Sequence, residues 1–219
     1  MSEFTYEEKD TTSALETFEW DNTWIDHATD TTSPRVLYIG DSISCGTRRV
    51  ATIATGEKIL FDGFGTSKAL DNPFLKDSIK LFAAQQPRRD AIIINNGLHG
   101  WHLNDKTEYK KYYKELIEFL LNEFSDTPIF IVLTTYVVSK TYIPEGSSKE
   151  SRETRVKDRN SAALDLAKEY GIKVIDLYTV SAENPELLCG DGVHFTPDGY
   201  STLANTIITT LCNELDITY

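Results

Sequence analysis

The sequence predicts an α/β fold, a three-layer α/β/α sandwich around a parallel sheet of about five strands. Two patterns indicate this fold. Short runs of branched apolar residues recur along the chain, and longer amphipathic stretches with helical spacing lie between them. Strands that are apolar throughout are typical of a sheet covered by helices on both faces. The 219 residues are also enough for one domain with a single large core.

Five segments are expected to form the strands. They are residues 36–39, 59–61, 91–94, 129–133 and 172–175, of which 59–61 carries the weakest pattern. Residues 1–34 precede the first of them and are expected to form an arm that packs on the body, residues 35–219. The apolar side chains of this arm are Phe18, Trp20 and Trp24.

Three helices have clear boundaries in the sequence. The first begins at Asp105, because Glu108 three residues later completes a capping box. Its apolar face is expected to comprise Tyr109, Tyr112, Tyr113, Leu116, Ile117, Leu120, Leu121 and Phe124. The second helix covers residues 151–170 and ends at a glycine, Gly171. The third begins at Thr196, which is followed by proline.

The charge of the chain excludes several classes of partner. A net charge of −12 would repel the phosphates of nucleic acid and the anionic surface of a membrane. The sequence has no apolar stretch near the ~20 residues of a membrane span and no secretory signal. The three cysteines, Cys45, Cys189 and Cys212, fit no disulfide framework or zinc site. We therefore expect a cytoplasmic protein, with an exported mature form as the open alternative.

The residues that follow the first strand suggest a nucleophile. Gly40-Asp41-Ser42 places a serine one turn beyond a buried strand, at the expected start of a helix. The helix dipole at such a position favours a developing oxyanion. Taken alone, this serine is more simply read as a helix cap. Cys45 is the rival nucleophile, but it lies one turn further into the helix.

A base for this serine is expected near the end of the chain. Asp191 and His194 are three residues apart in a glycine-bearing loop before the last helix. One tight turn can then bring the carboxylate to the imidazole, where it sets the tautomer and stabilises the imidazolium. A capped turn is the alternative interpretation of this pair. Asp176 is the weaker candidate for the carboxylate.

Other strand ends supply hydrogen-bond donors for an oxyanion. Gly65 can present a backbone N–H, and Asn96 or His99 can present a side-chain N–H. Each of these residues taken alone is consistent with an ordinary turn. Together with the serine and the Asp–His pair, they describe a site for acyl transfer.

These residues resemble the SGNH/GDSL hydrolase family, which is marked by four short sequence blocks. Gly40-Asp41-Ser42 matches the first block and Asp191-Gly-Val-His194 the last, in the expected order. The resemblance covers about residues 35–212 and implies a flavodoxin-like fold. It also implies ester hydrolysis through an acyl-enzyme on Ser42, with neither a metal nor an organic cofactor. In this family His194 would take the proton, Asp191 would orient His194, and the backbone N–H of Ser42 would help to hold the oxyanion.

The middle two blocks match less completely. Gly65 best fits the oxyanion glycine of the second block, although Gly63 lies two residues away. The third block usually reads Gly-x-Asn-Asp, whereas here it reads Gly97-Leu-His99-Gly. His99 thus stands where the family has the oxyanion asparagine, and a neutral imidazole N–H could donate there. Asn96, at the strand end, is the alternative donor.

The expected substrate is a short-chain ester. Trp101, His102 and Tyr136 follow strands at the same edge and are expected to line the pocket, together with the loop 142–146. Aromatic walls with polar neighbours suit a sugar ring. The favoured substrate is therefore a small-molecule acetyl ester or an acetylated oligosaccharide. The alternative for Trp101 is that its side chain packs in the core. His99 and His102 lack a third ligand for a metal. The other functions considered are an O-acyltransferase with the same triad and a non-catalytic carbohydrate-binding relative.

Overall fold

The computed structural model describes residues 14–16, 18–138 and 152–218. In this part of the chain a six-stranded sheet has the order β1-β3-β2-β4-β5-β6. Its strands are β1 (Asp21–Trp24), β2 (Arg35–Gly40), β3 (Leu60–Thr66), β4 (Ala91–Ile94), β5 (Ile129–Val132) and β6 (Lys173–Ile175). β2 to β6 are parallel, whereas β1 pairs antiparallel with β3. All five predicted strands are therefore present.

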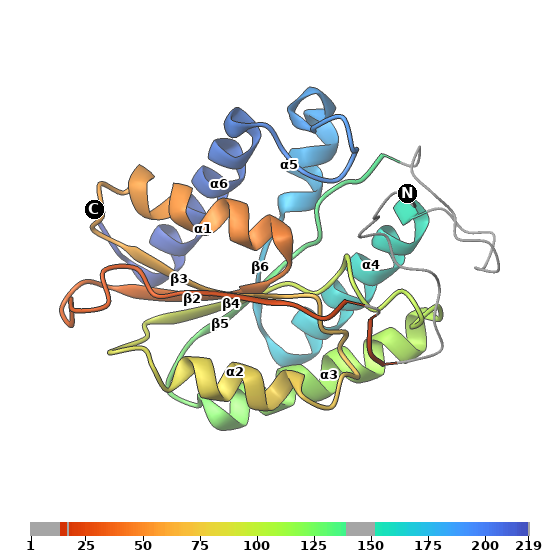
Figure 1. Cartoon of the computed structure of the whole chain (residues 1–219), viewed down its shortest axis with the longest axis horizontal. Helices are drawn as coiled ribbons and strands as arrows, with labels where there is room; N and C mark the ends of the chain where they lie inside the picture. Colours follow the sequence, from red (N-terminus) through yellow and green to blue (C-terminus); the bar gives the residue numbers. More distant parts are fainter. Residues whose placement is uncertain (1–13, 17, 139–151, 219) are drawn as a thin grey trace, which may run out of the picture.

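Helices cover both faces of the sheet, so the predicted three-layer α/β/α fold is confirmed (Figure 1). α1 and α6 lie on one face, and α2, α3 and α4 cover the other. The described helices are α1 (Ser42–Ala54), α2 (Leu75–Ala83), α3 (Lys106–Glu123), α4 (Arg152–Tyr170), α5 (Leu177–Glu183) and α6 (Pro197–Leu215), with a short 3-10 turn at Pro185–Leu187.

Each face of the sheet has its own apolar core. Alternate residues of β2 and β4 point to opposite faces: Leu37 and Ile92 pack with α2 and α3, while Val36 and Ile93 pack with α6. Every residue of β2, β4 and β5 is buried. For this reason the central strands are almost entirely apolar, with the buried Arg35 at the start of β2 as an exception, and this is the pattern from which the parallel sheet was predicted.

The helix boundaries agree with the sequence signals. The Asp105 carboxylate accepts hydrogen bonds from the backbone N–H groups of Thr107 and Glu108, and the Thr196 hydroxyl accepts one from that of Gly199. Gly171 follows α4 with a φ of +66°, a conformation that favours glycine. None of the helices in the described residues is long and apolar enough to cross a membrane.

The sequence missed β1 and misjudged the arm around it. All four residues of β1 are exposed, so the strand lacks the apolar alternation by which strands are recognised. The side chains of Phe18 and Trp24 are also exposed, at 51% and 46%, which contradicts the prediction that they pack the arm onto the body. Trp20 does pack on the body, edge-on against His99 with ring centroids 5.7 Å apart. Backbone pairing with β3, in the register Asn22↔Gly65, and the ion pair of Asp21 with Lys68 also hold this segment.

β3 is longer than the predicted strand, and two helices were not foreseen. β3 continues through Gly63 and Gly65 to Thr66, although glycine weakens a strand signal. Both glycines lie under α1: a Cβ on Gly63 would come within 2.2 Å of the Arg48 side chain. The unpredicted helices, α2 and α5, have only 9 and 7 residues, fewer than the ~11 over which helical spacing is usually counted.

Candidate active site

The candidate site lies at the carboxyl ends of the parallel strands, where ligands usually bind in such sheets. Ser42 is the first residue of α1, directly after β2. The Asp41 side chain caps this helix by accepting a hydrogen bond from the backbone N–H of Ile43 at 2.9 Å. The cap fixes the turn between strand and helix, and it leaves Ser42, which is half-buried, at the positive end of the helix dipole.

Ser42, His194 and Asp191 form a continuous hydrogen-bonded chain. The Oγ of Ser42 lies 2.8 Å from Nε2 of His194, although 152 residues separate them. On the other side of the ring, Nδ1 of His194 lies 2.7 Å from Oδ2 of Asp191. An ionised carboxylate only accepts hydrogen bonds, so Nδ1 carries the proton and Nε2 is free to accept one from the serine. This is the arrangement of a nucleophile, a base and an orienting acid.

The Asp191 carboxylate is held in its charged form. Its Oδ1 accepts the backbone N–H groups of Val193 and His194, each at 2.9 Å. Partial burial acts to raise the pKa of Asp191, but these hydrogen bonds and the His194 ring outweigh it and bring the pKa below its usual value. The carboxylate can therefore stabilise an imidazolium at His194 whenever the ring takes up a proton.

The two rival residues from the sequence lie elsewhere. Asp176 caps α5, where its carboxylate accepts the backbone N–H and the hydroxyl of Thr179 at 2.9 and 2.7 Å. Cys45 packs against Gly65, and burial raises the pKa of its thiol, which lowers the thiolate fraction needed for attack. Within residues 14–16, 18–138 and 152–218, Asp176 therefore has no bond to His194, and Cys45 has no histidine as a base.

Gly65 lies at the end of β3, beside the start of α1. Its register partner in β2 is Gly40, and a Cβ on Gly65 would lie 3.5 Å from the carbonyl oxygen of Asp41. Gly65 is thus adjacent to the residue that precedes Ser42, whereas Gly63 lies under the Arg48 side chain. The predicted assignment of the second block to Gly65 is the one that fits this geometry.

The loop after β4 holds the two candidates for the third oxyanion donor. The side-chain amide of Asn96 donates to the carbonyl oxygen of Lys68 at 2.9 Å, while the neighbouring Asn95 bonds to β5. His99 is turned toward the N-terminal segment, with Nδ1 2.8 Å from Oε1 of Glu16. A neutral His99 that donates from Nδ1 to a carboxylate has no second N–H, so the expected donation by a neutral imidazole fails with this partner.

Arg159, which the sequence analysis did not single out, holds this loop from α4. Its guanidinium donates to the carbonyl oxygens of Gly97, His99 and Gly100 at 3.1, 2.7 and 2.7 Å. Burial lowers the pKa of Arg159 to about 10, so the group remains cationic at neutral pH. Arg159 lies 60 residues beyond His99, and nothing in its local sequence signals this contact.

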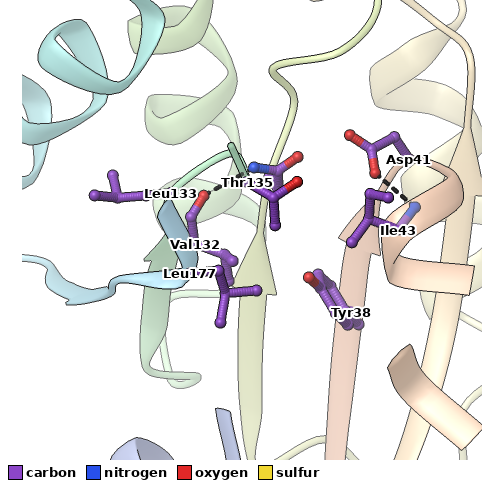
Figure 2. Close-up of a pocket in the computed structure, with 8 residues that line it drawn as sticks. Tyr38, Asp41, Ile43, Val132, Leu133, Thr135 and Leu177 are labelled. Carbon is purple, nitrogen blue, oxygen red and sulfur yellow. Dashed lines mark hydrogen bonds between the residues drawn. The ribbon is translucent and has the colours of Figure 1, made fainter. Parts of the chain in front are cut away.

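A small cavity of about 10 Å³ lies behind the first turn of α1 (Figure 2). Asp41 and Thr135 face it from opposite sides, and Tyr38 and Leu177 are among the apolar residues that line it. Burial raises the pKa of Asp41, an effect that His99 and His194 partly oppose. The cavity is too small for an alkyl chain, so an acyl group would have to bind outside it.

Two of the three predicted substrate-binding residues belong to the framework. The Trp101 side chain is only 8% exposed, and guanidinium groups of Arg155 and Arg159 stack on its ring at 4.8 and 4.5 Å. His102 bonds through Nε2 to both oxygens of Asp71 at 2.9 Å. Both side chains are thus engaged within the fold, Trp101 by arginine stacking and His102 by a carboxylate, and their role in substrate binding stays a prediction.

The third predicted substrate-binding residue, Tyr136, is half-buried and packs edge-on against Tyr178, with ring centroids 6.4 Å apart. Its role in binding stays a prediction. The loop 142–146, expected at the same edge, lies outside the described residues. Within the described ranges no group of three or more His, Cys, Asp or Glu side chains could hold a metal ion.

The fold is similar to those of several solved esterases and transferases. A lipase/acylhydrolase from Enterococcus faecalis is 18% identical with a TM-score of 0.62, over 83% of this chain and 96% of that one. An acetyl xylan esterase is 17% identical (TM-score 0.60, 81% and 99%). The catalytic domain of peptidoglycan O-acetyltransferase A from Streptococcus pneumoniae is 18% identical (TM-score 0.62, 84% and 96%). No protein with a curated description matches the chain by sequence.

The family itself follows from the sequence. Residues 38–201 match the model of the GDSL-like Lipase/Acylhydrolase family. The matched stretch contains the Gly-Asp-Ser turn, β3, the loop after β4 and the Asp191–His194 loop. This match covers most of the chain and agrees with the likeness of fold. The chain therefore belongs to the GDSL-like Lipase/Acylhydrolase family.

Proposed function

We propose that the protein is a serine esterase that hydrolyses short-chain acyl esters, acetyl esters above all, through an acyl-enzyme on Ser42. The observation that carries this proposal is the hydrogen-bonded chain from Ser42 to His194 to Asp191, with distances of 2.8 and 2.7 Å. A serine hydroxyl is hardly ionised at neutral pH and needs such a base to attack a carbonyl.

The reaction follows from the geometry in two halves. Ser42 Oγ attacks the acyl carbonyl carbon while its proton moves to Nε2 of His194. The tetrahedral intermediate then expels the alcohol oxygen, which takes that proton and leaves as the free alcohol. Water attacks the acyl-enzyme with His194 again accepting the proton. Collapse of the second intermediate returns the proton to Ser42 and releases the carboxylic acid.

Backbone N–H groups are expected to stabilise the oxyanion in both halves. The N–H of Ser42 belongs to the first turn of α1, where it has no partner within the helix. Gly65 provides the second N–H in this proposal, and His99 or Asn96 the third donor. Loss of one such donor typically lowers kcat by about 10²–10³-fold.

Short acyl chains are proposed because the sequence shows no extended apolar insertion that could form a lid or a broad groove for a long chain. A carbohydrate as the alcohol part is suggested by likeness alone, since an acetyl xylan esterase and a peptidoglycan O-acetyltransferase domain share the fold. Tyr136 is the more accessible aromatic candidate for contact with a sugar, because Trp101 is only 8% exposed.

A transferase would use the same triad and pass the acyl group to a sugar hydroxyl instead of water. The likeness to the O-acetyltransferase domain makes this the second candidate. A non-catalytic carbohydrate-binding protein would have no need of the aligned serine, histidine and aspartate, and is the weakest of the three.

The test is hydrolysis of p-nitrophenyl acetate, butyrate and octanoate by the wild type, Ser42→Ala and Ser201→Ala. Ser201 lies exposed on α6 and serves as the matched control. We expect activity that falls with chain length, survives in Ser201→Ala and vanishes in Ser42→Ala. Activity retained by Ser42→Ala would refute the nucleophile. Product analysis with an added sugar acceptor separates hydrolysis from transfer.

A further inference from the structure

The small cavity behind the first turn of α1 has two buried oxygen atoms in its wall that need a hydrogen-bond partner. Asp41 and Thr135 face each other across it, and each residue is only 3% exposed (Figure 2). Oδ2 of Asp41 and Oγ1 of Thr135 have no hydrogen-bond partner among the described residues. Buried polar atoms are nearly always bonded to protein or to ordered water, so both atoms require an explanation.

The Asp41 carboxylate is fixed in its direction. Its Oδ1 accepts the backbone N–H of Ile43 at 2.9 Å, and the Asp41 carbonyl oxygen accepts the hydroxyl of Ser44 at 2.6 Å. These bonds leave Oδ2 at the cavity. A buried carboxylate oxygen without a hydrogen bond is unfavourable, so Oδ2 needs a donor from this side.

Thr135 is held equally firmly, because both of its neighbours in the chain are anchored. The backbone N–H of Thr134 donates to the Asn160 side chain, and the Asn160 amide donates back to the Thr134 carbonyl oxygen, both at 2.8 Å. The backbone N–H of Tyr136 donates to Oγ of Ser181, also at 2.8 Å. These bonds oppose a shift of Thr135 toward α1, so the gap has to be bridged by another group.

The volume and the chemistry of the cavity select a water molecule. About 10 Å³ is close to the space that one water needs, and it leaves no room for a larger ligand. Apolar cavities stay dry, whereas buried waters have two to four polar partners. Asn95 also lines the cavity; its amide nitrogen donates to the carbonyl oxygen of Val132 and to Oγ1 of Thr134, which leaves its own carbonyl oxygen as an acceptor.

We propose that this cavity binds one water molecule, which donates to Oδ2 of Asp41, accepts from the hydroxyl of Thr135 and thereby holds the turn that carries Ser42. Asp41, Asn95 and Thr135 follow β2, β4 and β5, three successive strands of the sheet. The water therefore ties the carboxyl ends of these strands together at the nucleophile.

This water is a positioning group and not the water that attacks the acyl-enzyme. Among the described residues that line the cavity there is neither Ser42 nor His194. The site itself does not depend on the proposed esterase activity, and only its expected effect on kcat rests on that function.

High-resolution crystal structures of the wild type, Thr135→Val and Thr135→Ser test the site directly. We expect one water within hydrogen-bonding distance of Asp41 Oδ2 and Thr135 Oγ1 in the wild type. Thr135→Ser keeps the hydroxyl and should keep the water, whereas Thr135→Val keeps the shape but should lose most of its density. A dry cavity in the wild type, or a direct bond between Asp41 and Thr135, would overturn the proposal. Unchanged density in Thr135→Val would refute Thr135 as a partner.

The positioning role is tested by kcat and KM for p-nitrophenyl acetate. Thr135→Val should lower kcat by between about 10-fold and about 100-fold with KM nearly unchanged, as expected for a small displacement of a reacting group. Thr135→Ser should restore most of the loss. A wild-type kcat in Thr135→Val would refute the role in positioning.

Thr47→Val is the matched control, because it also removes a buried threonine hydroxyl. The hydroxyl of Thr47 donates to the Ile43 carbonyl oxygen at 2.6 Å within α1, and Thr47 does not line the cavity. We expect near wild-type kcat and the same water in this control. Equal losses of kcat in Thr47→Val and Thr135→Val would show that the loss does not pass through the water.

Ser42→Ala separates this inference from the proposed function. Its crystal structure should retain the water, because the Ser42 side chain does not line the cavity. If Ser42→Ala stays active, the esterase mechanism is wrong, while the water site still stands or falls by its density. If Ser42→Ala is inactive and the wild-type cavity is dry, only the water site is refuted.

Discussion

Cys45 packs directly on Gly65, so closely that a Cβ added to Gly65 would lie 2.2 Å from the Cys45 sulfur. The other atoms near this position, the carbonyl oxygens of Asn22 and Asp41, are 3.5 Å away and would tolerate it. The need for glycine at this point of β3 is thus set by one side chain of α1. The contact also keeps the end of β3 close to the turn that carries Ser42.

We expect Gly65→Ala to lower the free energy of unfolding by about 1–3 kcal/mol, because overpacking forces α1 away from β3. Cys45→Ala removes the clashing sulfur, so the double variant should be more stable than Gly65→Ala and should regain activity. Both keep the backbone N–H of residue 65. Urea unfolding and p-nitrophenyl acetate hydrolysis check this, and additive losses of stability would contradict it.

Asp191→Asn should reduce kcat by about 10³–10⁴-fold while KM changes little, because an amide can present its N–H to Nδ1 and stabilise the wrong tautomer of His194. Asp176→Asn is the control, since Asp176 only caps α5. Steady-state kinetics with a short-chain ester should show near wild-type kcat for this control. Similar losses from both variants would mean that the Asp191 carboxylate has no special role.

Asp41 should make the protein less stable as the pH rises. Burial raises its folded-state pKa above the usual 3.8, so between these values the folded protein binds more protons than the unfolded chain. Stability then falls with increasing pH in this window. In Asp41→Asn the amide oxygen can still accept the Ile43 N–H, but the side chain no longer titrates. The melting temperature of this variant minus that of the wild type should therefore increase as the pH is raised from about 3 to about 7. Circular dichroism melts check this, and a constant difference would contradict it.

Arg159→Ala should destabilise the protein by about 3 kcal/mol or more, because several buried carbonyl oxygens would lose their donor. Arg159→Lys should rescue little of this, since an ammonium cannot reproduce the planar guanidinium. Arg152→Ala is the control: Arg152 is half-buried, and its guanidinium lies over the Trp101 ring at 5.5 Å without a hydrogen bond to the loop carbonyls among the described residues. Chemical denaturation should show a small loss of unfolding free energy for the control. Equal losses in both variants would refute the role of Arg159 in holding the loop after β4.

Trp101→Ala should cost about 3–5 kcal/mol of stability, as expected for a large buried aromatic side chain. The milder Trp101→Phe should leave KM for p-nitrophenyl acetate close to that of the wild type, because the ring is buried and stacked on by arginine side chains. Thermal unfolding and kinetics test both statements. A large rise in KM with unchanged stability would restore Trp101 to the pocket.

The strands and long helices were predictable because their signals are local. β4 and the part of β2 that follows Arg35 are buried on both faces and carry the apolar run of a buried strand. The helices α3 and α6 are preceded by Asp105 and Thr196, which cap them through their own side chains. β1 gave no such signal, because all its residues are exposed and only backbone pairing with β3 makes it a strand. α2 and α5 are shorter than the ~11 residues over which helical spacing is usually counted.

For the site, the sequence by itself determined the Gly-Asp-Ser turn and the Asp-x-x-His loop, because both are short motifs whose residues lie close in any fold that contains them. Only the tertiary structure decided what depends on contacts between distant segments. It brought Ser42 to His194, turned His99 toward Glu16, and buried Trp101 beneath arginine side chains of α4. The direction of a side chain depends on partners far along the chain, and a local pattern carries no information about them.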